Sequence, residues 1–128
     1  MALADSNYYE AVVYKNATVD ASTRIDLPRG LGAFNQVTVR LVVGGVTGGS
    51  DTFDIDLDTS FTEGATTAGV RDWVEVISMT QASAATSETK YDVRDGSTSW
   101  GDVNSIEVTV GTGATATGVF LTVVGANA

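Results

Sequence analysis

The sequence predicts an all-β protein, an antiparallel β-sandwich or jelly roll of about eight strands. Three observations support this fold class. Valine and threonine are abundant, and β-branched side chains pack well on a pleated sheet but less well in a helix. Apolar and polar residues alternate with period two in short runs. Turn residues, including most of the 14 glycines, separate these runs.

In the first half of the chain, the expected strands cover residues 8–14, residues 18–27 and residues 36–43. Proline and glycine at residues 28–30 end the second of these. The third alternates most clearly, because four apolar residues share one face: Val37, Val39, Leu41 and Val43. The glycine-rich residues 44–50 are expected to form a turn or loop.

The remaining strands are expected over residues 52–58, 72–80, 89–94, 105–110 and 117–124. Residues 62–69 are rich in glycine, threonine and alanine and are expected to form a loop. Residues 81–88 are small and polar, which indicates a loop or at most one helical turn. Asp95-Gly96, after the strand at 89–94, is typical of a hairpin turn.

The length of 128 residues predicts a single domain over residues 1–128, with residues 1–10 as an extended arm. Several strands have apolar residues on both faces, such as Val42 beside Leu41 and Phe120 beside Leu121. One face of such a strand fills the core. The other face is then expected to meet a loop or a neighbouring subunit.

The composition excludes several kinds of chemistry. The chain has no cysteine and no histidine, which rules out disulfides, thiol catalysis and a Ser-His-Asp triad. Its net charge is −9, with 16 acidic and 7 basic residues, so it repels nucleic acid and anionic membranes. We expect no signal peptide and no transmembrane segment, and therefore synthesis in the cytoplasm.

The stretch "TFDIDLDT" raises the question of a cation site, because three acids share one strand face: Asp54, Asp56 and Asp58. Calcium prefers several carboxylate oxygens, and D-x-D-x-D begins an EF-hand loop. The stretch departs from that loop, since Thr59 stands where glycine is needed and Ala65 where glutamate is needed. We therefore interpret it as the solvated face of a strand. Subordinate metal candidates at the strand's ends are Asp51, Asp58 and Glu63.

No catalytic or cofactor-binding residue is predicted, and we expect a protein that is not an enzyme. The glycine-rich residues 44–50 fit G-x-x-x-x-G but continue with Ser50-Asp51, where a P-loop needs lysine. A carboxylate pair could in principle hydrolyse glycosides, but the sequence places no two carboxylates across a cleft.

Three aromatic residues are candidates for contact with a partner. Trp100 lies in the polar stretch of residues 95–102. It could stack on a sugar ring or fill a pocket of a neighbouring subunit, or it could cap one end of the sandwich. Tyr8 and Tyr9 point to opposite faces of their strand, so that one faces the core and the other could anchor to a partner.

The chain resembles small structural proteins of tailed-phage virions, in particular capsid decoration (cement) proteins. Three segments carry this resemblance of composition: "MALADSNYYEAVVYKN", "VTVRLVVGGVTGG" and "ATATGVFLTVVGANA". It implies a homo-oligomer that clamps capsid subunits, with the major capsid protein or other virion subunits as partners. It transfers no site residue. A tail or neck component is the alternative within this class, and a carbohydrate-binding or adhesion domain is the alternative outside it.

Overall fold

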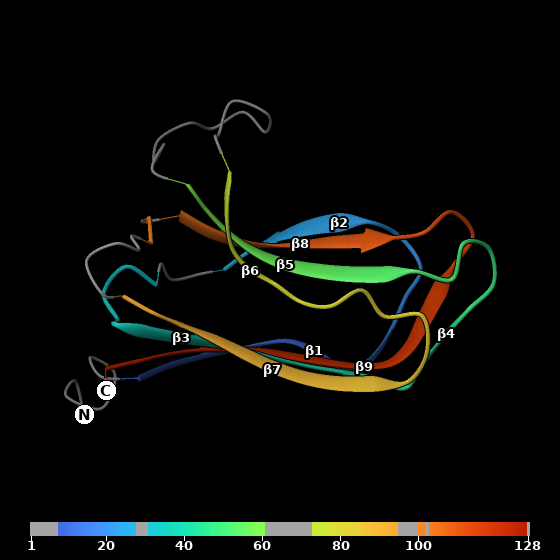
Figure 1. Cartoon of the computed structure of the whole chain (residues 1–128), viewed down its shortest axis with the longest axis horizontal. Coiled ribbons are helices and arrows are strands. Elements are labelled where there is room, and N and C mark those ends of the chain that lie inside the picture. The colour runs from blue at the N-terminus through green and yellow to red at the C-terminus, as the bar shows by residue number, and fades with distance from the viewer. Residues whose placement is uncertain (1–7, 28–30, 61–72, 95–99, 102, 128) are drawn as a thin grey trace.

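The computed structural model describes residues 8–27, 31–60, 73–94, 100–101 and 103–127. The regular structure of these residues is entirely β-strand (Figure 1). The strands are β1 (Tyr8–Val19), β2 (Thr23–Asp26), β3 (Gln36–Val43), β4 (Gly45–Thr47), β5 (Phe53–Ser60), β6 (Val74–Ser78), β7 (Thr86–Val93), β8 (Val103–Val110) and β9 (Thr115–Ala126).

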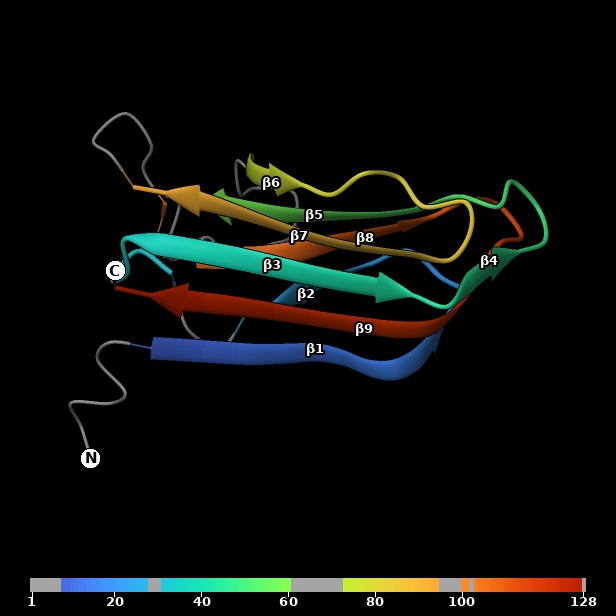
Figure 2. The ribbon, with the colours of Figure 1, turned by 60° about the horizontal axis from the view of Figure 1, so that its bottom comes forward.

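The strands form two antiparallel sheets that face each other (Figure 2). The five-stranded sheet has the order β1-β9-β3-β7, and the short β4 pairs with the first part of β9. The four-stranded sheet has the order β2-β8-β5-β6. The chain crosses from one sheet to the other between β1 and β2 and at five later connections, so the sandwich cannot be cut into two sequential halves.

This strand order is a jelly roll. When β4 is set aside, the first strand pairs with the last, β2 with β8, β3 with β7, and β5 with β6. Successive pairs alternate between the two sheets, as they do when one long antiparallel hairpin is rolled up. The sequence prediction of an all-β sandwich is confirmed, and the pairing selects the jelly roll from the two expected architectures.

The core lies between the sheets and is built by period-two alternation. On β5, Phe53, Ile55 and Leu57 are fully buried, as the alternation predicts. The five-stranded sheet supplies the opposite wall with inward residues of β3 and β9: Val37, Val39, Leu41, Val43, Val119, Leu121 and Val123. Burial of this set is the main stabilising contribution, at about 25 cal/mol per Å² of apolar surface.

The prediction of an arm over residues 1–10 is wrong from Tyr8 onward. Tyr8 pairs with Ala126 and Glu10 with Val124, so these residues belong to the sheet. Residues 1–7 lie outside the described part of the chain. The strand expected at residues 18–27 is divided, because residues 18–19 end β1 and only residues 23–26 form β2. The intervening residues carry the chain from one sheet to the other.

Two predicted loops contain strands. Residues 45–47 form β4 within the expected 44–50 loop, and residues 86–88 open β7. The polar start of β7 hides it from pattern analysis, because an edge strand tolerates polar residues on both faces. Asp95-Gly96 lies outside the described residues, but the flanking strands β7 and β8 lie in different sheets and form no hairpin with each other. No helix in the described segments has the length and apolar character needed to cross a membrane.

A close approach of two backbones at Gly101 yields a test of the packing at the end of β5. A Cβ at Gly101 would lie 2.4 Å from the Ser60 carbonyl oxygen and 2.8 Å from Thr59 Oγ1. Overpacking of this kind costs about 1–3 kcal/mol, so we expect Gly101→Ala to lower the unfolding free energy by that amount in urea denaturation.

Gly45→Ala is the matched control, because the nearest atom to its added Cβ, Thr117 Oγ1, is 3.8 Å away. Equal stability of the two variants would contradict the close approach at Gly101.

Candidate functional site

The acidic stretch of β5 is the first candidate, and its structure corrects the sequence prediction at one residue. Asp54 and Asp56 are half-buried on the outer face of the four-stranded sheet, opposite the buried apolar residues. Asp58 is only 6 % exposed. The prediction of a solvated face is therefore wrong for Asp58.

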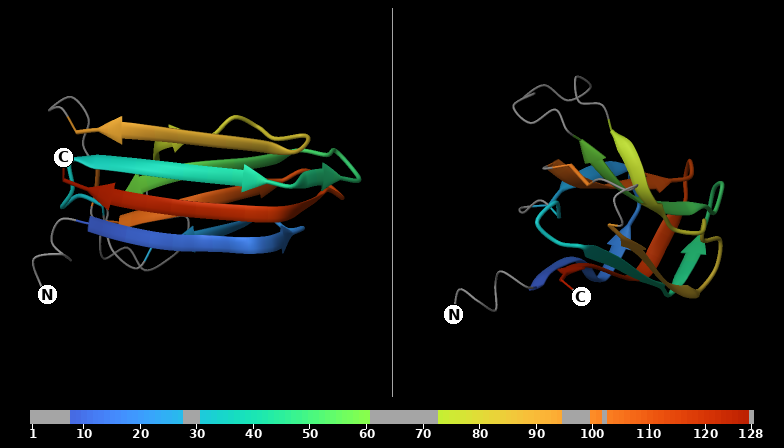
Figure 3. Two further views of the ribbon diagram at one scale, coloured as in Figure 1. Left: turned by 90° about the horizontal axis from the view of Figure 1, so that it is seen from below. Right: turned by 60° about the vertical axis from the view of Figure 1, so that its left-hand side comes forward.

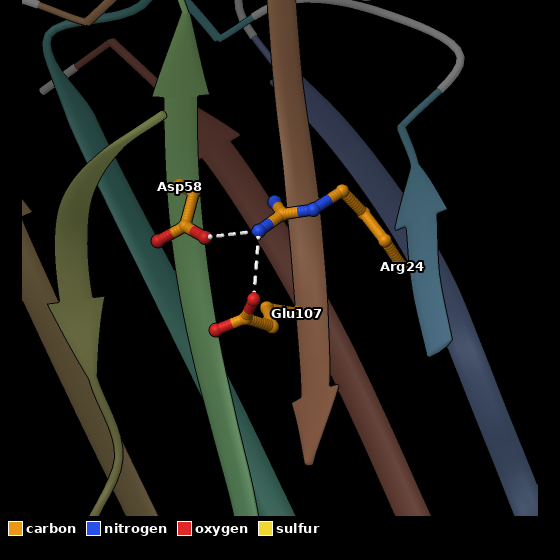
Figure 4. A network of polar contacts seen from close by, with 3 residues as sticks. All are labelled: Arg24, Asp58 and Glu107. Carbon is orange, nitrogen blue, oxygen red and sulfur yellow. Dashed lines mark hydrogen bonds and ion pairs between the residues drawn. The ribbon is translucent and has the colours of Figure 1, made fainter. Parts of the chain in front are cut away.

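Asp58 is covered because Arg24 reaches it across the sheet (Figure 4). From β2, the Arg24 side chain crosses the intervening strand β8, and its Nη2 lies 3.0 Å from Asp58 Oδ2 and 3.0 Å from Glu107 Oε2. The Trp73 ring lies over the guanidinium, with its centroid 4.4 Å from Cζ. This arrangement connects three neighbouring strands through one positive charge, and an aromatic ring shields it from water.

The electrostatics around Arg24 are dominated by carboxylates. Burial raises the pKa of Asp58, and the hydrogen bond and charge of Arg24 only partly oppose this rise. Desolvation, and then the charges of Asp56, Asp58 and Glu107, raise the pKa of Glu75 on β6. One guanidinium thus faces several carboxylates. Asp58 and Glu75 therefore bind protons more tightly than isolated carboxylates do.

The metal candidates are not brought together. Asp51 precedes β5 in an exposed turn with φ of 32°, whereas Asp58 is near the other end of that strand. The part of β5 from Phe53 to Asp58 alone spans about 17 Å. Glu63 lies outside the described residues. Within the described residues, no group of three or more acids is arranged to hold a metal ion.

Trp100 caps the core between the two sheets. It is 2 % exposed, and its Nε1 donates a hydrogen bond to Asp92 Oδ2 of β7 at 3.0 Å. A ring this deeply buried offers no face to a sugar or to a neighbouring subunit. The structure therefore favours the capping interpretation of Trp100.

Tyr8 and Tyr9 lie on opposite faces of β1, as predicted. Tyr8 is 50 % exposed on the outer face, and its hydroxyl donates to Glu10 Oε2 at 2.7 Å. Tyr9 packs against the core, where its ring stacks on Phe34 with centroids 6.3 Å apart. Of the three aromatic candidates, only Tyr8 presents its ring on the surface.

The outer face of the five-stranded sheet is the larger candidate site, and we call it the apolar face. Five of the six large exposed apolar side chains among the described residues lie on it: Tyr8, Val12, Tyr91, Val93 and Phe120. They come from β1, β9 and β7, which the strand order places in one surface (Figure 3). Contiguous exposed apolar surface is typical of interaction sites, which makes this face a candidate.

A groove lies on the apolar face, over the paired strands β3 and β9. It has a volume of about 390 Å³ and is lined by Arg40, Val42, Phe120 and Thr122. The sequence indicated Val42 and Phe120 as second-face apolar residues. It did not indicate Tyr91 and Val93, because their strand β7 is otherwise polar and charged.

Comparisons with protein-family models, with curated proteins and with solved structures find no match to this chain.

The raised pKa values of Asp58 and Glu75 give the stability of the fold a definite pH dependence. A carboxyl whose pKa is raised on folding contributes stability below its ordinary pKa of about 4, and this contribution is lost as the pH rises through the folded value. We therefore expect Asp58→Asn to show a smaller gain in Tm than the wild type when the pH falls from about 7 to the ordinary carboxyl pKa of about 4.

Thermal unfolding followed by circular dichroism at each pH measures this difference. Asp51→Asn makes the same change in net charge at an exposed position and serves as the control. A wild-type and an Asp58→Asn profile of the same slope would contradict the assignment.

Substitution of Trp100 tests its role in the core. We expect Trp100→Ala to cost about 3–5 kcal/mol of unfolding free energy in urea denaturation, because it leaves a cavity and removes the donor to Asp92. Trp100→Phe keeps most of the ring volume and should cost less. An alanine variant as stable as the wild type would show that the indole is not part of the core.

Proposed function

We propose that this protein is a non-enzymatic structural subunit of a virion, which decorates and stabilises a phage capsid through subunit–subunit contacts. The observation that carries the proposal is the apolar face. The core lies on the other side of this sheet, so the exposed side chains of the apolar face are available to a second protein.

The distribution of charge supports a contact at this face. The whole chain has a net charge of −9. Where residues 8–12 pair with β9, however, the outer face of the sheet carries only two charged side chains, Glu10 and Arg40, and their charges are opposite. A partner that approaches here meets little net repulsion. The acids elsewhere keep the protein soluble at high local concentration.

The topology is compatible with this role. Jelly rolls occur in viral capsid proteins and in lectins, although a fold alone does not determine a function. A decoration protein binds its shell in many copies and needs no reactive group, so modest affinity at each copy suffices. The ion pair of Arg24 with the buried Asp58 likewise serves the fold, because it connects strands of the four-stranded sheet.

A tail or neck component could use the same apolar face. Binding experiments with capsid shells and with tails would separate these roles. The carbohydrate-binding alternative loses its main residue, because Trp100 is buried. Tyr91, at 67 % exposure, is the most exposed large apolar residue on the apolar face and would have to replace it.

Co-sedimentation with shells assembled from the major capsid protein of the same virus tests the proposal. We expect the wild type to sediment with the shells and Phe120→Glu to lose at least about tenfold in affinity, equal to about 1.4 kcal/mol, because a charge in the groove must be desolvated.

Val74→Glu is the matched control, since Val74 is 53 % exposed but lies on the other sheet. If the wild type does not sediment, or if both variants bind as the wild type does, the proposal fails. Retained binding of oligosaccharides by a chain without affinity for shells would favour the adhesion alternative.

A further inference from the structure

Apart from the three-residue β4, which pairs only with β9, the described sheets have four edge strands, and these differ in how well they are protected. The edges are β1 and β7 in the five-stranded sheet, and β2 and β6 in the four-stranded sheet (Figure 3). An edge strand presents N–H and C=O groups that can pair with another chain. Proteins protect such edges with charged side chains, short strands, bulges or covering segments.

Three of these edges are protected. The strand β2 has only four residues, and β6 has five residues with a register shift opposite β5. Three charged residues occur on β7: Glu88, Lys90 and Asp92. Two of them connect this edge to the chain near β6, because Lys90 Nζ donates to the Ser78 carbonyl oxygen and the Thr80 N–H donates to Glu88 Oε1. A second chain would have to displace these contacts.

The first part of β1 lacks this protection. Residues 8–12 pair with β9 in unbroken register, and among described strands β1 pairs only with β9. Residues 8–14 include no proline and one charged side chain, Glu10. The register shifts begin after Val12, and Asn16 has a positive φ of 52°. The straight, weakly charged part of the edge is therefore confined to the beginning of β1.

The side chains along this segment are also suited to a partner strand. Tyr8 and Val12 are 50 % and 56 % exposed on the outer face, whereas Ala11 between them packs inward against the core. A strand laid beside β1 would cover part of both exposed side chains and would extend the inner face.

We propose that β1 pairs antiparallel with β1 of a second copy of this chain, about a two-fold axis perpendicular to the sheet. The two five-stranded sheets then join into one continuous sheet, and the isologous contact closes without forming a fibre. This inference deepens the proposed function by identifying the contact between copies, but its geometry stands on the edge alone.

Charge selects the register of this pairing. A two-fold axis centred on Glu10 would place two carboxylates directly opposite each other, which is destabilising. An axis centred on Ala11 places Glu10 opposite Val12 of the second copy, and both residues belong to the segment that pairs with β9 in unbroken register. The two carboxylates are then not directly opposite each other, so this is the register that we expect.

Disulfide trapping tests the register. Because the chain has no native cysteine, only the introduced thiols can form a disulfide. We expect the double variant Glu10→Cys/Val12→Cys to form a covalent dimer under mild oxidation, since the expected register places residue 10 opposite residue 12 at a Cα distance of about 4.5–5.5 Å. The single variants should cross-link poorly, because like residues then lie about 8 Å apart.

The matched control is Ser87→Cys/Thr89→Cys, which has the same spacing on the protected edge strand β7. A covalent dimer through β7 with none through β1 would overturn the proposal.

Sedimentation equilibrium measures the association without cysteine. We expect the wild type to show a monomer–dimer equilibrium and Val12→Lys to weaken the dimer by at least about tenfold, because lysine protects an edge. Val93→Lys makes the same change on the same face at the opposite edge and should leave the equilibrium unchanged.

A wild type that is monomeric at all concentrations would overturn the proposal, as would equal effects of the two lysine variants. Failure here is distinguishable from failure of the proposed function, because a monomer could still sediment with capsid shells and a dimer could fail to do so.

Discussion

The arrangement of the protein depends on the pairing of β9 with strands on both of its sides. Along its length, β9 hydrogen-bonds β1 on one side and β3 on the other, while its first residues pair with β4. Its inward residues Val119, Leu121 and Val123 are fully buried. Without β9, the five-stranded sheet would lose the strand that joins β1 to β3. The apolar face and the wall of the core would then both be interrupted.

The two sheets present outer surfaces of different chemical character. On the four-stranded sheet, the outward positions of β2, β8 and β5 carry charges, and Arg24 connects the three strands through Asp58 and Glu107. On the five-stranded sheet, the outward positions include five of the six large exposed apolar side chains of the described residues, among them Tyr91 and Phe120. The outer surface of the four-stranded sheet is therefore acidic, whereas that of the five-stranded sheet carries most of the large exposed apolar side chains of the described residues.

The sequence predicts the fold class well because alternation reports directly on burial. It assigns β3 over its full length and places Phe53, Ile55 and Leu57 inward. It cannot predict that Asp58 is buried, because the covering residues Arg24 and Trp73 are distant in the sequence and no local pattern pairs them. Trp100 is misleading for a similar reason: its neighbours along the chain are polar, whereas its neighbours in space are the core and Asp92. The apolar face was partly visible in Val42 and Phe120, but its extension to β7 follows only from the strand order.

The pairing of the first strand with the last has a consequence for biosynthesis. Tyr8 pairs with Ala126, so the beginning of β1 has no partner until β9 has been synthesised. Contacts between residues so distant in sequence make β-rich proteins fold slowly, and unpaired strands expose them to aggregation while they wait. The first part of β1 is also the least protected edge of the finished molecule. A nascent chain would therefore hold β1 unpaired until β9 emerges, and crowding on a polysome would favour premature contacts between neighbouring chains.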